Sequence, residues 1–257
     1  DNIANEEYAI YAFEMTWSLE DGHSATQTFV REGEELPEYP DALYIIGGSL
    51  NTEDSDADDT PDGWQWDLTD VPMVPVHSNP HVFWKVVYLE AAGDGIKFAP
   101  QREWAGDFGV DAGAGETDGV YAVGNDNVPE VTDAGYYMVV VNLLDETVEV
   151  NDPMIYGIGD AFDTWDAAQS ATLFTVDNTA KTATSPAAIA DGDLRIHVAA
   201  STLTKDNDDP VDWWQAEFSV IDGDIVYRGT GGDLAAVPVT TGQTVTLNFT
   251  TETGVIE

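Results

Sequence analysis

The chain has 257 residues, of which 43% are hydrophobic, and its 49 acidic and 8 basic side chains give a formal net charge of -41 at pH 7. This charge repels the phosphates of nucleic acids and anionic membranes, and so it excludes both as partners. The sequence has no cysteine, which excludes disulfides and thiolate metal sites. It also has no apolar run approaching the ~18 residues of a transmembrane helix. Because like charges destabilise a compact state, we expect the protein to work where salt screens them.

Strand signals dominate the chain from its beginning to its end. Short segments rich in Val, Tyr, Phe and Thr are bounded by Gly, Asp, Asn or Pro, a pattern typical of β-strands. They cover residues 8–17, 24–30, 82–88, 96–99, 136–143, 194–198, 216–220 and 245–249. No long stretch has helical periodicity, so the sequence predicts an all-β fold of two tandem antiparallel β-sandwiches.

The chain also repeats itself at domain length. The first copy runs from LYIIGG at 43–48 to GYYMVVVNLL at 135–144 and closes on ETVEV at 146–150. The second runs from IYGIGD at 155–160 to GQTVTLNF at 242–249 and closes on ETGVI at 252–256. A repeat of this length indicates two modules, which we expect at 41–151 and 152–257. Residues 1–40 are expected to hold an N-terminal β-hairpin and a proline-bounded linker, and the hairpin is either the end of a preceding domain or an extra ribbon packed on the first module.

Motifs for catalysis are weak. The sequence has no nucleophile elbow, phosphate-binding loop, dinucleotide fingerprint or Cys-His pair. Carboxylates for glycoside hydrolysis are too abundant to be informative, so an enzyme remains only an alternative. The four histidines lack metal-ligand spacing, and no cofactor is expected. The acidic run at 54–59 is either a solvated loop or a calcium site, although it lacks the glycine at loop position six and has Gln65 where a closing Glu is expected.

Tryptophans beside hydrogen-bonding groups are more informative. In the first copy, Trp64 and Trp104 lie in predicted loops, with Lys97 between them and an Asn-rich loop containing Asn125 and Asn127. The second copy offers Trp165, Arg195, the adjacent Trp213 and Trp214, and Asp233 in a glycine-rich loop.

Such a set suits a sugar, because an indole covers the apolar CH face of a pyranose while charged and amide groups bind its hydroxyls. The competing interpretation is that the tryptophans fill the core. We expect this for Trp66, Trp84 and one of Trp213 and Trp214, and we expect exposure for Trp64, Trp104 and Trp165. Lys97 and Arg195 could alternatively form structural ion pairs in so acidic a chain.

Several short sequence segments, in the order in which they occur, resemble those of a known protein family. In the first copy these are YIIG, DGW at 62–64, IKF at 96–98, WAG at 104–106, GNDN at 124–127 and DAGYY at 133–137. The second copy has LRIHVAA at 194–200, WWQAEF at 213–218 and YRGTGGD at 227–233. From about residue 40 onward, the chain resembles the SusE/SusF-like surface glycan-binding lipoproteins of Bacteroidetes.

This resemblance implies a function and a set of site residues. It implies lipid-anchored, noncatalytic starch-binding modules on the outer membrane, which hold polysaccharide near an importer. Because family members usually begin with an immunoglobulin-like domain, it also implies that residues 1–36 are the final strands of such a domain. The family's aromatic cradle, basic residue and loop Asn carry over to Trp64, Lys97, Trp104 and Asn125 or Asn127. In the second copy they carry over to Trp165, Arg195 and Trp213 or Trp214, where the loop ending at Asp233 departs from the Asn pattern. Arg102 completes the candidate residues, and a scaffold that contacts other proteins of a surface complex is the alternative function.

Overall fold

The structure is a computed structural model that describes residues 9–18, 22–32 and 38–257. The chain divides into two compact units, Asp1–Tyr39 and Pro40–Glu257. The first unit contains an antiparallel hairpin of β1 (Ala9–Ser18) and β2 (Gly22–Glu32), which matches the two strands predicted there. Residues 19–21, which join the two strands, lie outside the described residues.

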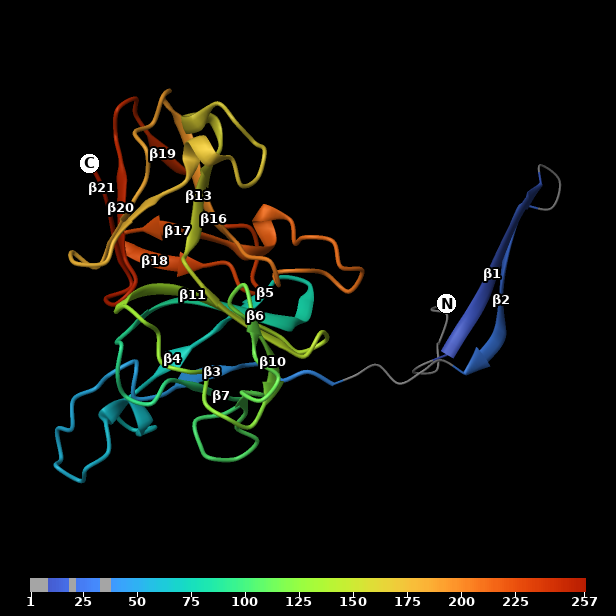
Figure 1. The fold of residues 1–257 in the computed structure, drawn as a ribbon. Helices are drawn as coiled ribbons and strands as arrows, with labels where there is room; N and C mark the ends of the chain where they lie inside the picture. The colour runs from blue at the N-terminus through green and yellow to red at the C-terminus, as the bar shows by residue number, and fades with distance from the viewer. Residues whose placement is uncertain (1–8, 19–21, 33–37) are drawn as a thin grey trace. The chain divides into compact units, whose positions relative to one another are not determined.

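The first repeat forms two facing sheets (Figure 1). The smaller one has the order β4-β3-β7, built from Val71–Pro72, Tyr44–Ile46 and Lys97–Ala99. The larger one has the order β5-β6-β11-β12-β10-β8, with β9 added beside β10. Its strands are β5 (Val74–Val76), β6 (Asn79–Leu89), β8 (Gly109–Val110), β9 (Glu116–Thr117), β10 (Val120–Gly124), β11 (Gly135–Asn142) and β12 (Thr147–Asn151).

The second repeat forms one strongly curved sheet of order β13-β16-β17-β18-β21-β20-β15-β14, with β19 added beside β16. Its two ends approach each other, because Phe174, just before β14, donates its N–H to the carbonyl of Ile155 in β13 at 2.9 Å. The strands are β13 (Met154–Ile158), β14 (Thr175–Asp177), β15 (Thr182–Thr184), β16 (Gly192–Ala199), β17 (Glu217–Ile221), β18 (Asp224–Tyr227), β19 (Val237–Val239), β20 (Val245–Asn248) and β21 (Thr253–Ile256).

All helices among the described residues are short 3-10 turns: η1 (Asp62–Trp64), η2 (Asp160–Phe162), η3 (Ser170–Thr172) and η4 (Trp213–Ala216). No described helix is long and apolar enough to cross a membrane. The predicted all-β, antiparallel fold is therefore confirmed, and the eight predicted strands are present with shifts of a few residues at their ends. The sequence patterns missed mainly strands of two to five residues, which are too short to show alternation.

Alternation along β6 and β11 explains how the repeats pack. In β6, Phe83 and Val87 face the smaller sheet and fill the core of the first repeat. Their neighbours Val82, Trp84 and Val86 face the opposite way, into a second core.

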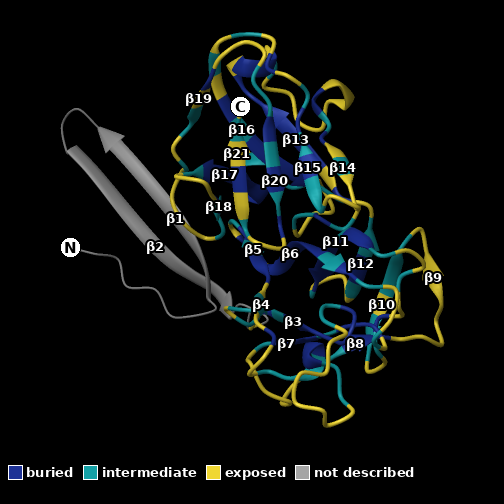
Figure 2. Ribbon diagram, turned by 90° about the vertical axis from the view of Figure 1, so that its left-hand side faces the viewer, coloured by how far each residue is buried: buried dark blue, intermediate teal, exposed yellow. Residues whose placement is uncertain are grey.

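This second core is shared between the repeats. Residues of β6 and β11 pack in one buried cluster with Ile196, Phe218, Leu247 and other side chains of the second repeat. In Figure 2, the buried strands β6 and β11 of the first repeat lie next to strands of the second repeat. The second repeat thus does not close a core of its own, and the two repeats stand as one body.

Candidate functional site: two exposed tryptophan pairs

The first tryptophan cluster lies at one end of the smaller sheet. Trp64 ends η1, and its indole Nε1 donates to the carbonyl of Gly93 at 2.9 Å. Close backbone packing makes this possible, because a Cβ on Gly48 would overlap the Gly93 carbonyl and press on the Trp64 ring. Trp104 comes from the loop at 100–106 and remains 53% exposed. Its ring centroid lies 6.1 Å from that of Trp64, with 33° between the planes.

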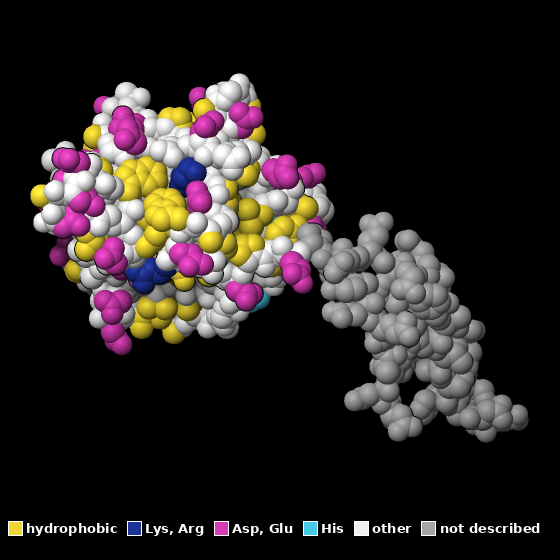
Figure 3. Space-filling view, turned by 90° about the horizontal axis from the view of Figure 1, so that it is seen from below, with side chains coloured by type: hydrophobic (Ala, Val, Ile, Leu, Met, Phe, Trp, Pro, Cys, Tyr) yellow, Lys and Arg dark blue, Asp and Glu magenta, His cyan; other side chains and the backbone are white. Residues whose placement is uncertain are grey.

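Trp66 joins this cluster from the side. Its ring meets Trp104 edge-on at 5.6 Å, and it is only half-buried, so the expectation that it belongs to the core is wrong. Trp84 is fully buried, as expected. Figure 3 views the molecule from the end that carries the smaller sheet and shows exposed hydrophobic side chains gathered beside basic ones.

Lys97 lies at the same end of the sheet. It is the first residue of β7, directly opposite Ile46 of β3, and its Nζ pairs with Asp107 Oδ2 at 3.0 Å. Both side chains of this pair remain partly exposed. Bridges between Ile96 and Val128 and between Val110 and Asp126 bring the Asn-rich loop alongside.

The other predicted residues of the first site differ in whether their side chains already form hydrogen bonds within the protein. Asn125 is exposed, whereas Asn127 donates its amide to the carbonyl of Asp94 at 2.7 Å. Arg102 donates to the carbonyl of Trp66 at 2.8 Å and lies 3.5 Å from Asp70. These contacts hold the loop that carries Trp104 in place. No sequence pattern predicts this role of Arg102.

The second cluster repeats the first. Trp165 follows η2, is 50% exposed, and donates its indole N–H to Asp160 Oδ1 at 3.0 Å. Trp213 begins η4, and its ring centroid lies 5.9 Å from that of Trp165 with 51° between the planes. A capping box between Asp212 and Gln215 fixes η4 and so fixes the position of Trp213.

Trp214 points elsewhere. Its ring meets His77 of the first repeat edge-on at 5.2 Å and lies 4.9 Å from the guanidinium carbon of Arg228. Of the two adjacent tryptophans, Trp213 is therefore the one that the structure places beside Trp165. Neither is fully buried, so the expectation that one of them belongs to the core is wrong.

Backbone geometry relates the two clusters residue by residue. Gly47 donates its N–H to the carbonyl of Gly63 at 2.8 Å, and Trp64 follows. Gly159 donates its N–H to the carbonyl of Thr164 at 2.7 Å, and Trp165 follows. The residue before each glycine, Ile46 or Ile158, stands opposite the cation, Lys97 or Arg195. Each repeat thus sets one tryptophan and one cation at the same two positions of its fold.

The cation of the second site is held more tightly. Arg195 contacts the buried Glu217 at Oε1 and binds both carboxylate oxygens of Asp233 at 3.1 and 3.3 Å. Arg228 binds the same two acids at 3.2 and 3.0 Å. Burial alone would lower the pKa of Arg195, but its hydrogen bonds to Glu217 and Asp233 outweigh burial, so the pKa of Arg195 is raised. The hydrogen bond from Arg195 lowers the pKa of Asp233. Sequence reasoning missed Glu217 and Arg228; the one available signal was an acid inside the apolar strand segment at 216–220.

The acidic run forms a cluster on the surface. Carboxylate oxygens of Asp54, Asp56 and Asp58 lie within 4.8 Å of one another, and Asp54 accepts the N–H groups of Asp58 and Asp59 at 3.1 Å each. Asp59 takes a positive φ of 68° at the position where a calcium loop has glycine. Calcium here stays a prediction.

Each cluster offers an apolar surface of two indoles, one exposed (Trp104 or Trp165) and one half-buried (Trp64 or Trp213), bordered by charged and amide groups. The expected exposure of Trp64 is therefore only partly met. Such a surface fits a ligand with a flat apolar face and a rim of hydroxyls. Each repeat carries one of the two sites.

Comparison with known proteins identifies the family of the chain. The family model described as SusF/SusE starch specific CBMs matches residues 43–150 and 154–255. Outer membrane protein SusF of Bacteroides thetaiotaomicron is 39% identical over 225 residues, which cover 85% of this chain and 44% of that protein. The crystal structure of SusF from Bacteroides thetaiotaomicron matches with a TM-score of 0.67 and 34% identity, covering 92% of this chain and 52% of that one. The chain thus spans about half the length of these relatives. By sequence and by fold, it belongs to the SusF/SusE family of starch-specific carbohydrate-binding modules.

Proposed function

We propose that this chain binds starch or maltooligosaccharides without cleaving them and holds them at the bacterial outer membrane, near a glycan uptake system. The family's description supports an α-glucan ligand. The printed name of the relative, an outer membrane protein, supports the location. The net charge of -41 is not required for sugar recognition, and we attribute it to habitat.

The observation that carries the proposal is the repeated geometry of the two sites. Both have a tryptophan after a glycine-anchored turn, a second tryptophan about 6 Å from it, and a cation opposite the residue that precedes the glycine. Core packing does not require Trp104 and Trp165, since half of each ring is in solvent. A shared use by ligand explains why each repeat keeps a tryptophan pair with one exposed ring.

The rigid junction between the repeats strengthens the proposal. Tyr136 donates its hydroxyl to the carbonyl of Lys181 at 2.8 Å. Glu149 accepts hydrogen bonds from Ser201 Oγ and Thr202 N at 2.8 Å each. These contacts, added to the shared core, keep the two sites at a fixed separation. A polysaccharide long enough to reach both then gains avidity without new contacts.

Affinity electrophoresis in gels containing amylopectin tests the proposal. Trp104→Ala and Trp165→Ala should each weaken retention by about 1–3 kcal/mol, the scale of one aromatic contact, and the double variant should lose most of it. Ile189→Ala serves as the matched control, because Ile189 is 64% exposed but lies in neither cluster. Wild-type migration unaffected by every soluble α-glucan would refute the starch assignment.

Incubation with labelled maltoheptaose tests the noncatalytic part separately. The oligosaccharide should remain intact after prolonged contact with the protein. Cleavage would favour the hydrolase alternative, whereas neither retention nor cleavage would favour a scaffold that uses its tryptophans to contact other proteins.

A further inference from the structure

A cavity lies between the two repeats. This pocket has a volume of about 810 Å³ and is lined by both repeats, but by none of the four tryptophans of the two pairs. It lies where the chain crosses from β4 in one sheet to β5 in the other. Strand β5 pairs with β6 only as far as Trp84, so the edge of β6 from Lys85 to Tyr88 faces the pocket.

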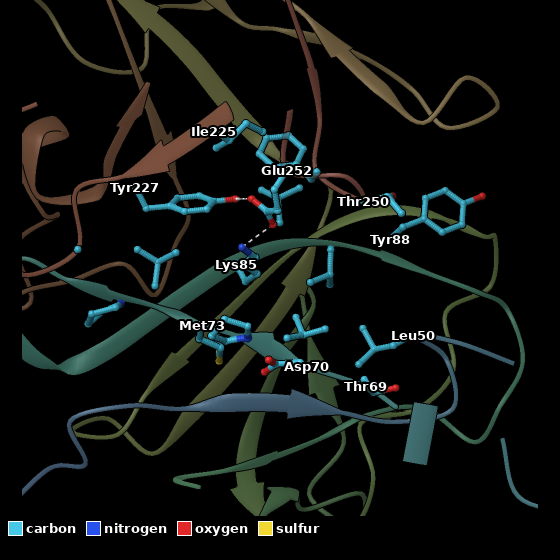
Figure 4. Close-up of a pocket in the computed structure, with 18 of the residues that line it drawn as sticks. Leu50, Thr69, Asp70, Met73, Lys85, Tyr88, Ile225, Tyr227, Thr250 and Glu252 are labelled. Atoms are coloured by element: carbon cyan, nitrogen blue, oxygen red, sulfur yellow. Dashed lines mark hydrogen bonds and ion pairs between the residues drawn. The ribbon is translucent and has the colours of Figure 1, made fainter. Parts of the chain in front are cut away.

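The polar centre of the pocket joins the two repeats. Lys85 of β6 is only 6% exposed, and its Nζ lies 2.7 Å from Glu252 Oε1. Tyr227 donates its hydroxyl to Glu252 Oε2 at 2.6 Å, and its ring lies 4.2 Å below the Lys85 ammonium. Figure 4 shows these three side chains along one wall, with Asp70 and Met73 opposite.

This ion pair is buried on one side only, because the side chain of Lys85 is 7% exposed and that of Glu252 is 40% exposed. Removing the ammonium from water is repaid only in part by its attraction to the carboxylate, and an apolar replacement at such a position often stabilises a fold as well or better. Burial indeed lowers the pKa of Lys85 against the opposing effect of Glu252. An ammonium has three donors, and a carboxylate has four acceptor sites, so the pair can still donate to and accept from a ligand.

The charge of the pocket defines the ligand. Three of the eight basic residues of the chain line it, namely Lys85, Lys181 and Arg228, together with three acidic ones, Asp70, Glu90 and Glu252. The charges that line the pocket therefore cancel, although the whole chain has a net charge of -41. Each of these cations is also paired with a carboxylate. A neutral ligand fits such a lining better than an ion.

The walls add apolar surface and hydroxyls. Leu68, Pro72, Met73 and Ile225 stand beside the side chains of Thr69, Thr230 and Thr250. This mixture suits a molecule with CH faces and many hydroxyls, and the volume lies in the range of ligand pockets, about 300–1,000 Å³. An added peptide strand fits less well, because the open edge of β6 is short and Pro72 and Pro75 lack N–H donors.

We propose that the pocket between the repeats is a third carbohydrate site, which takes a short neutral oligosaccharide at Lys85, Tyr227 and Glu252. The inference rests on the proposed glycan-binding function, but it uses none of the exposed tryptophans. It gives the junction between the repeats a role in binding as well as in rigidity.

The test removes the other sites first. In a Trp104→Ala/Trp165→Ala background, maltopentaose and cellopentaose are titrated while the methyl NMR signals of Met73 and Ile225, which line the pocket, are observed. Maltopentaose should shift both signals saturably at millimolar concentration. Adding Thr230→Trp, which fills the pocket from its exposed wall, should weaken this binding at least about tenfold. Thr175→Trp, on an exposed position of β14 outside the pocket, should not.

Each outcome bears on the proposal. If neither oligosaccharide shifts Met73 and Ile225 saturably, or if Thr175→Trp acts like Thr230→Trp, the third site is overturned. Thr230→Trp in a chain with all tryptophans intact should give the circular dichroism spectrum of the wild type, which shows that the variant folds, and should still be retained by amylopectin through the Trp64–Trp104 pair, which lies in the other repeat. Failure of wild-type retention refutes the proposed function, whereas a silent pocket in a retained protein refutes only this inference.

Discussion

The two sites have the same tryptophan positions but hold their cations differently. Lys97 has one partner, Asp107, and both are partly open to water. Arg195 belongs to a network with Arg228, Asp233 and Glu217, whose carboxylate is completely buried. The first site therefore presents an ammonium with a single, partly solvated partner, and the second presents a guanidinium held by two carboxylates. Preorganisation of this kind lowers the entropy lost on binding but also uses donors that a ligand needs.

The largest expected effect is a difference in how much each ion pair contributes to the free energy of unfolding. Glu217→Gln leaves two arginines without their buried counter-ion and should lower the free energy of unfolding by about 3–5 kcal/mol. Asp107→Asn, the matched change in the first site, should cost less than about 1 kcal/mol, because that pair is partly solvated. Urea denaturation at neutral pH measures both. Similar losses for the two variants would show that the networks do not differ as described.

Acid should act on the second repeat through His197. This imidazole is 1% exposed, stacks on Tyr156 at 5.5 Å, and has a pKa lowered by burial to about 4. Between pH 6.5 and 4 the unfolded chain binds a proton that the folded chain does not, so stability falls as pH falls through this window. The loss from pH 7 to 4.5 should be about 2–3 kcal/mol.

The control for this effect is His197→Gln, which cannot titrate. Protonation of carboxylates in so acidic a chain also changes stability with pH, and the variant shares that change. The difference between wild type and variant in urea denaturation therefore isolates the imidazole. A difference that stays constant from pH 7 to 4.5 would contradict the lowered pKa.

These comparisons depend on features that the sequence predicted unequally. Residue alternation predicted the long strands, and loop composition around Trp104 and Trp165 predicted their exposure, because Gly and Asp at those points indicate surface turns. Trp213 and Trp214 could not be separated, since adjacent residues of a 3-10 turn point about 120° apart and the sequence does not show which way the turn faces.

Long-range contacts were beyond sequence patterns altogether. The charge of Glu217 gives no hint that two arginines converge on it, and nothing links Lys85 to Glu252 across most of the chain. The shared core was hidden for a related reason. Strand β6 is apolar on both faces, and such a run predicts burial without showing that the second face meets another repeat.

The smallest expected effect concerns binding by the two cations. With the second tryptophan pair disabled by Trp165→Ala, Lys97→Met should weaken maltoheptaose binding by about 1 kcal/mol, the value of one hydrogen bond, and leave stability nearly unchanged. With the first pair disabled by Trp104→Ala, Arg195→Met should lower affinity and stability together, because it also leaves the buried Glu217 with a single arginine partner. Calorimetric titration and urea denaturation of the same samples separate the two patterns. If Arg195→Met lost affinity alone, its guanidinium would be a free ligand group, and the second site would be as loosely held as the first.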